Sequence, residues 1–207
     1  MNKNQQQKQL VPKLRFPEFK NDGEWEEKAI GILFNFKQGV QVSVKNQSLI
    51  QKKSMVRFIR IIDITKNDKE PFRFIENPGN EYNVNKQDLF MIRYGTPGVI
   101  ATGYEGVIAN NLFRLIWNYA DTFLSKYWYY NFYRIEKKIS NLAGSSSMAA
   151  INFSTLKNKK IFFPKKIKEQ QKIADCLSSL DNLIEVQTQK IEYLKQHKKG
   201  LMQGLFP

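Results

Sequence analysis

The clearest hydrophobic pattern of the chain lies between residues 169 and 205. Apolar residues recur there in alternating steps of four and three, which is the spacing of the a and d positions of a heptad, and the stretch holds no proline. The pattern predicts one helix of roughly 50–55 Å, at ~1.5 Å per residue, whose apolar seam faces another helix. The predicted seam consists of Ile173, Leu177, Leu180, Ile184, Gln187, Ile191, Leu194, Lys198, Leu201 and Leu205.

Two of these seam positions, Gln187 and Lys198, are polar. A polar side chain in a helix seam fixes the register of pairing at some cost in stability. The alternative is an ordinary amphipathic helix packed on its own domain, but the segment is longer than a small core needs. The sequence therefore favours a spacer and pairing arm over residues 166–207.

The part of the chain before the arm has the short apolar runs of a β-rich domain. A β-branched and aromatic run from Met55 to Ile64 predicts a buried strand. Short glycine-containing connections between the later runs favour an antiparallel or strongly bent sheet over repeated βαβ units. Further strands are predicted at residues 73–75, 88–93, 99–102, 107–109, 112–117 and 161–163.

A second helix is predicted from Asp121, as its cap, to Ser140, because apolar residues recur there at spacings of three and four. The residues from Asn152 to Leu156 are expected to be an irregular approach to the last strand. The predicted class is α+β, with a mixed, strongly bent sheet and a long C-terminal coiled-coil-forming helix. The predicted units are a disordered lead-in (1–12), a globular domain (13–165) and the helical arm (166–207).

Charge narrows the class of partner. Thirty-three Lys and Arg face nineteen Asp and Glu, so the net charge is +14 and the pI is near 9.7. Such an excess favours a polyanion, with nucleic acid ahead of a membrane surface. Cys176 is the only cysteine, which rules out an intrachain disulfide and predicts a small buried side chain. With no apolar run of ~18 residues and no secretory signal, we expect a cytoplasmic location and no membrane contact.

Basic and polar side chains gather in the predicted loops and strand ends, where lysines can neutralise phosphates and arginine or serine can reach base edges. These residues make double-stranded DNA the leading partner. The candidate DNA-binding residues are Lys45, Lys52, Lys53, Arg57, Arg60, Lys66, Arg93, Tyr94, Ser145, Ser146, Lys157, Lys159 and Lys160.

Catalytic and metal-binding patterns are not found. The single histidine, His197, lies among lysines on the arm, and one cysteine elsewhere on the arm cannot complete a zinc site. Phosphate-binding and nucleophile-elbow motifs are also missing. Asp63, Asp68 and Glu70 suggest a small nuclease as one alternative, although a solvated loop explains them better. We therefore expect no catalytic residue, no metal site and no cofactor in this chain.

Two stretches resemble a known family, the specificity subunits of type I restriction–modification enzymes. The start, LRFPEF followed by Gly23-Glu24-Trp25-Glu26, is similar to the beginning of a target recognition domain. The end, from INFSTLKNKKIFFP to KKGLMQGLFP, looks like the family's conserved helical region. Between them, RFIRIIDIT, DLFMIRYGTPGVIA and NNLFRL are similar in shape to its recognition-domain strands.

The resemblance implies a non-catalytic protein that guides an adenine N6-methyltransferase (M) subunit, and through it a restriction (R) subunit, to DNA. S-adenosylmethionine, ATP and Mg²⁺ would then be used by those partner subunits. Members usually carry two recognition domains that read the halves of an interrupted target, separated by an antiparallel helix pair. This chain has one domain and one helix, so we expect either a natural half-subunit or the N-terminal half of a longer product.

The resemblance also implies that the arm needs a partner. A homodimer, or a pair with another half-subunit, would supply the second helix, and two copies related by a two-fold axis would read a palindromic, interrupted site. The alternative is a stand-alone dimeric DNA-binding module that works without a methyltransferase.

Overall fold

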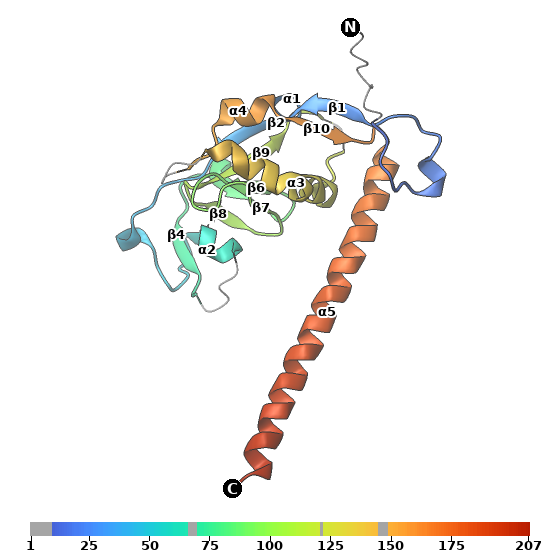
Figure 1. The fold of residues 1–207 in the computed structure, drawn as a ribbon. Helices are drawn as coiled ribbons and strands as arrows, with labels where there is room; N and C mark the ends of the chain where they lie inside the picture. The colour runs from blue at the N-terminus through green and yellow to red at the C-terminus, as the bar shows by residue number, and fades with distance from the viewer. Residues whose placement is uncertain (1–9, 66–69, 121, 145–148) are drawn as a thin grey trace.

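A body of small β-sheets and short helices carries a single long helix that projects away from it (Figure 1). The computed structural model describes residues 10–65, 70–120, 122–144 and 149–207. The strands are β1 (Glu26–Ala29), β2 (Phe34–Gln38), β3 (Met55–Ile59), β4 (Arg73–Glu76), β5 (Asn83–Val84), β6 (Leu89–Ile92), β7 (Ile100–Ala101), β8 (Gly106–Ile108), β9 (Leu112–Trp117) and β10 (Lys160–Phe163). The helices are α1 (Ile30–Leu33), α2 (Ile61–Ile64), α3 (Ser125–Ser140), α4 (Phe153–Asn158) and α5 (Ile167–Leu205).

Within the described ranges the strands form three sheets, in the orders β1-β10, β2-β9-β6-β7 and β4-β3-β8-β5. All neighbours are antiparallel except β3 and β8, which run parallel. Gly106 permits this close approach: its φ is +141°, and a Cβ there would lie 2.3 Å from the carbonyl oxygen of Arg57. The arrangement confirms the predicted mixed α+β class, although the strands are divided among three sheets.

Strand β6 contributes buried apolar side chains to two separate cores. All four of its residues are buried, and they alternate between two cores. Leu89 and Met91 face the first core, whereas Phe90 and Ile92 face the second. Because successive side chains of a strand point to opposite faces, a continuous apolar run is what a strand covered on both faces requires.

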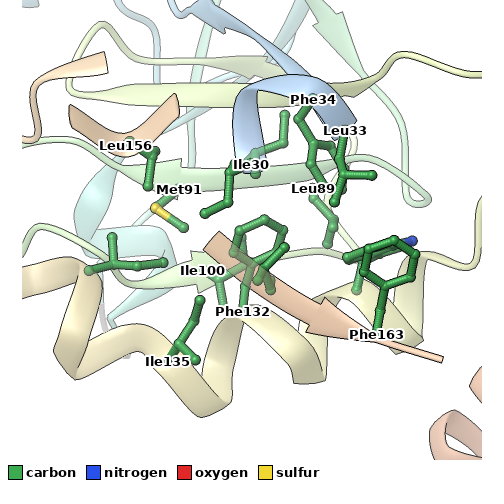
Figure 2. Close-up of a cluster of buried hydrophobic side chains, with 14 of the residues drawn as sticks. Ile30, Leu33, Phe34, Leu89, Met91, Ile100, Phe132, Ile135, Leu156 and Phe163 are labelled. Atoms are coloured by element: carbon green, nitrogen blue, oxygen red, sulfur yellow. The ribbon is translucent and has the colours of Figure 1, made fainter. Parts of the chain in front are cut away.

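Side chains of helix α3 and of strands β2, β9 and β10 together form the first core. Its predicted apolar face is confirmed, since Trp128, Phe132 and Ile135 are buried. Figure 2 shows Phe132 and Ile135 pointing from the helix toward Ile100, Phe34 and their neighbours. The ring of Phe34 contacts those of Trp128 and Phe132 edge-on, at centroid distances of 5.2 and 5.4 Å. Aromatic edge-to-face contacts of this kind add to the gain from burial.

The predicted strand from Met55 to Ile64 is too long. Strand β3 ends at Ile59, and Ile61–Ile64 form one helical turn. The cause is Asp63, whose carboxylate accepts the backbone N–H of Arg60 at 2.7 Å and its side-chain Nε at 3.0 Å. This local cap offers the backbone a partner other than a neighbouring strand.

Three further predictions need correction. Helix α3 begins at Ser125 and not at Asp121, which lies outside the described residues. The approach segment is helix α4, because the side chain of Asn152 caps its first turn by accepting the N–H of Ser154 at 2.9 Å. Strands β1, β2 and β5 were not predicted, because β1 and β2 have exposed or half-exposed residues that blur the strand pattern and β5 has only two residues.

Helix α5 confirms the predicted long helix. Its 39 residues span about 58 Å at 1.5 Å per residue. Only its first turns, at Glu169, Gln170 and Ala174, are buried. Cys176 is exposed, contrary to the prediction, because a step of two residues turns a helix by about 200° and so places Cys176 away from the buried Ala174. No helix in the described ranges combines the length and apolarity needed to cross a membrane.

A buried ion pair fastens the base of α5 to the N-terminal segment. Arg15 donates from Nε and Nη2 to the two carboxylate oxygens of Glu169, both at 2.8 Å, and the indole of Trp25 donates to the same carboxylate at 3.1 Å. The hydrogen bond to Glu169 raises the pKa of Arg15. The two side chains are only 6% and 2% exposed. The N-terminal segment, the body and the arm are thus joined at one point.

Candidate nucleic-acid interface

A hollow of about 580 Å³ beside β3 and β4 brings together two of the predicted lysines. Lys45 and Lys52 line it from the loop that leads into β3. Four neutral polar side chains, which the sequence prediction did not name, line it as well. They are Gln41, Asn46, Gln47 and Ser48. Their only sequence signal was a polar run alternating with valines between residues 39 and 48.

The loop around this hollow is held by hydrogen bonds. Its 3₁₀ turn spans Val44–Asn46, and the side chain of Gln47 donates to the carbonyl of Val42 at 3.0 Å. Ser48 and Phe74 exchange both backbone hydrogen bonds, at 2.8 and 2.9 Å, which ties the loop to β4. A fixed loop that combines lysines with amides and a hydroxyl can place charges at phosphates and polar groups at base edges.

Arg57 lies on β3, two residues after Met55, which lines this hollow. Its guanidinium carbon is 3.8 Å from the ring centroid of Phe72 and 5.5 Å from that of Tyr104. Phe72 is itself exposed, so the stacked pair lies at the surface. A stacked guanidinium is held in one orientation, and that orientation is what planar recognition of a base or phosphate needs. Among the predicted arginines, Arg57 is the one whose guanidinium stacks on an exposed ring.

Arg60 and Arg93 make several contacts inside the chain. Arg60 binds Asp63 and also donates to the carbonyl of Pro71 at 3.0 Å. Arg93 donates from Nη1 to the amide oxygen of Gln38 at 2.8 Å, and its guanidinium lies 4.6 Å from the ring centroid of Phe153. These contacts give both side chains a structural role. Tyr94, beside Arg93, forms a backbone bridge with Ala150.

A second basic cluster lies at the other end of the body. Lys159 and Lys160 line a hollow of about 370 Å³ together with Arg134 and Lys138 of α3. The sequence prediction missed the last two because it assigned that helix to the core, although their spacing of four residues places them on one helix face. Lys160 is also paired with Glu27, and Lys157 is exposed on α4.

The structure thus places Lys45 and Lys52 in one cluster and Lys159 and Lys160 in another, whereas Arg60, Arg93 and Tyr94 line neither hollow. Lys52 and Lys53 are exposed just before β3, whereas Lys159 and Lys160 lie at β10. Lys66, Ser145 and Ser146 lie outside the described residues.

The predicted seam of α5 forms the other candidate surface. Ile173 is half-buried against the body, and from Leu177 onward the seam is exposed, including Gln187. Ile184 and Leu194 are 63% and 59% exposed, far more than large apolar side chains of a core. The exposed apolar seam residues are Leu177, Leu180, Ile184, Ile191, Leu194, Leu201 and Leu205. An apolar stripe of this extent marks an interaction surface.

Asp63, one of the acidic residues suggested for a nuclease, is paired with an arginine. The Asp63 carboxylate is only 2% exposed and is bound to Arg60. In the part of the chain that the structure describes, no three His, Cys, Asp or Glu side chains group closely enough to hold a metal ion. Asp68 lies outside that part.

Several known proteins are similar to this chain in sequence or in fold. The type I restriction enzyme MjaVIII specificity subunit of Methanocaldococcus jannaschii is 27% identical over 136 residues, which are 65% of this chain and 31% of the relative. The putative MjaX specificity subunit of the same organism is 43% identical over 60 residues, 29% of this chain and 14% of the relative. The chain therefore spans a minor part of the curated relatives that it matches.

Solved structures show the same fold. The S subunit of a type I restriction–modification system from M. genitalium superposes with a TM-score of 0.66 at 22% identity, covering 90% of this chain and 46% of that one. The HsdS subunit of Thermoanaerobacter tengcongensis gives 0.59 at 16% identity, covering 85% and 41%. A family model described as the type I restriction modification DNA specificity domain matches residues 22–196, which include the body and most of α5. The chain belongs to this family of type I restriction–modification specificity domains.

Proposed function

We propose that this chain recognises a DNA sequence for a type I restriction–modification complex, as a non-catalytic specificity subunit with one recognition domain. The family match over residues 22–196 carries the proposal. In this role the body reads the DNA and α5 joins the subunit to its partners. The methyltransferase subunit modifies adenine, and the restriction subunit acts through it. S-adenosylmethionine, ATP and Mg²⁺ serve those partners and not this chain.

The hollow beside β3 and β4 is the surface that we assign to DNA. The net charge of +14 draws the chain to a polyanion, and Lys45 and Lys52 supply phosphate contacts. Gln41, Gln47 and the stacked guanidinium of Arg57 are side chains that can discriminate bases in the major groove. The cluster at β10 supplies further phosphate contacts.

Helix α5 is the pairing element in this proposal. Its exposed apolar seam is covered when a second helix runs antiparallel to it, in a second copy or another half-subunit. Two copies related by a two-fold axis present two identical recognition domains, and the target is then palindromic and interrupted.

A genome-wide map of N6-methyladenine, made in the host with and without this gene, tests the guiding role. We expect one interrupted motif to lose its methylation when the gene is removed. A palindromic motif would support pairing of two copies, whereas an asymmetric one would point to a different second half. If every motif keeps its methylation while the purified chain alone binds one sequence tightly, the stand-alone DNA-binding module replaces the proposal.

The DNA surface has its own test. The double variant Lys45→Gln and Lys52→Gln, assembled with the methyltransferase subunit, should lower the slope of log affinity against log salt by about 1.8 for each recognition domain on the DNA, at ~0.9 per phosphate contact. The control is Lys190→Gln with Lys195→Gln, which removes the same charge from the exposed arm and should leave the slope unchanged. Equal slopes for both double variants would remove the hollow from the DNA surface.

A further inference from the structure

A groove between α3 and α5 lies outside the hollow beside β3 and β4 that we assign to DNA. It measures about 560 Å³, and tyrosines of α3 form one wall while the first seam residues of α5 form the other. The hydroxyl of Tyr130 donates to the Asp181 carboxylate at 2.6 Å and so ties the two walls together. Tyr129 and Tyr133 stack with their centroids 6.0 Å apart, and Tyr133 remains exposed.

The groove and the seam of α5 are one continuous surface. Leu177, Leu180 and Ile184 belong to the seam and also line the groove. A helix that lies along the seam therefore brings one of its ends into the groove. Because the groove is at the N-terminal end of α5, an antiparallel partner brings its C-terminal end.

The polar seam residues favour a second copy in one register. When Gln187 faces Lys198 of the second copy, the amide oxygen can accept a hydrogen bond from the ammonium group. The other layers then pair apolar with apolar: Ile191 with Leu194, Ile184 with Leu201, and Leu180 with Leu205. A shift by one heptad toward the base of α5 places Gln187 opposite Ile191 and Lys198 opposite Leu180. That shifted register leaves polar groups without partners in an apolar seam, which costs free energy.

We propose that the groove between α3 and α5 receives the C-terminal turn, Leu201–Phe206, of a second copy of this chain, in an antiparallel pair whose register is set by Gln187 facing Lys198. The inference rests on the pairing role proposed for α5. In this register Leu205 of the second copy meets Leu180, and Phe206 lies against Leu177 and the tyrosine wall. Leu205 and Phe206 are 74% and 71% exposed in the single chain, so the groove and this turn cover each other's apolar surface.

Disulfide trapping between two singly substituted chains tests the register. In a Cys176→Ser background, Ile184→Cys mixed with Leu201→Cys should give a disulfide-linked dimer under mild oxidation. Ile184→Cys mixed with Leu194→Cys, which face each other only in the shifted register, should not. Each substituted chain oxidised alone is the control for nonspecific linkage. The reverse pattern would overturn the proposed register and leave pairing through α5 intact.

Substitution of the docked turn tests the groove. Leu205→Ser with Phe206→Ser should raise the dimer dissociation constant at least tenfold, as measured by light scattering over a dilution series. Tyr193→Ser is the matched control, because it removes an exposed aromatic side chain of α5 that lies off the seam. Equal dissociation constants for the double variant and the control would overturn docking. If the full chain stays monomeric at every concentration, this inference and the pairing role both fail. DNA recognition is tested independently, by the methylation map.

Discussion

The body and helix α5 place their apolar side chains in opposite surroundings. Phe34 and its neighbours are buried by residues of the same chain, whereas Ile184 and Leu194 lie in solvent along a seam just as regular. Burial stabilises by about 25 cal/mol per Å² of apolar area, so the body gains this free energy alone. The seam gains it only when another surface covers it. Stability of the fold and the proposed association with a partner therefore depend on separate segments.

The largest effect is expected in the body. Phe34→Ala should lower the free energy of unfolding by about 3–5 kcal/mol, because it removes a fully buried ring that contacts Trp128, Phe132 and Trp117. Urea denaturation followed by near-UV circular dichroism measures it. Leu194→Ala on the arm is the control and should leave unfolding of the dilute monomer unchanged. A similar loss for both variants would contradict the division between body and arm.

A change in the seam should have the next largest effect, and only on association. Ile191→Lys places a charge in the centre of the helix pair and should weaken dimerisation about a hundredfold, since an unpaired buried charge is costly. Light scattering measures the dimer, and circular dichroism should show an intact body. Val186→Lys, exposed on the same helix but off the seam, is the control. A dimer that survives Ile191→Lys would show that the seam is not the pairing surface.

The junction between body and arm should give the smallest of the three effects. Glu169→Gln leaves the buried Arg15 guanidinium without its charged partner and should cost about 2 kcal/mol, because the glutamine amide oxygen can still accept one of the hydrogen bonds. Thermal unfolding measures it. Lys195→Gln breaks an exposed pair with Glu192 and should change stability negligibly. Equal melting temperatures for wild type and Glu169→Gln would mean that the pair does not fasten the arm.

Elements with strong local periodicity could be predicted from the sequence. Helix α5, the apolar face of α3 and the buried strands β6 and β9 all follow from spacing within the segment itself. Strands β1 and β2 could not, because β1 is completed by β10 at a separation of over a hundred residues and presents only half-exposed or exposed side chains. The break after β3 depends on Asp63, whose capping role competes with an equally strong strand pattern.

The candidate DNA surface, too, could be predicted only in part from local sequence patterns. Runs of lysine indicated where charge gathers, and Lys45 and Lys52 do lie in one hollow. Whether an arginine is available to DNA depends on contacts made across the fold. Gln38, which is 55 residues away from Arg93 in sequence, holds that guanidinium, while Arg57 stacks on a ring at the surface. Such differences cannot be derived from residue type and local spacing.

The pairing of β1 with β10 has a consequence for how the body could be replaced. Glu26 lies opposite Phe163, so the chain enters and leaves the body through two adjacent strands, directly before α5 begins. Everything between those strands is covalently connected to the arm only through β10, while α3 also packs against α5 through the hydrogen bond from Tyr130 to Asp181. Under the proposed function, we expect that a different body with the same two end strands and the same α3 face can be grafted at this place and gives a new target preference.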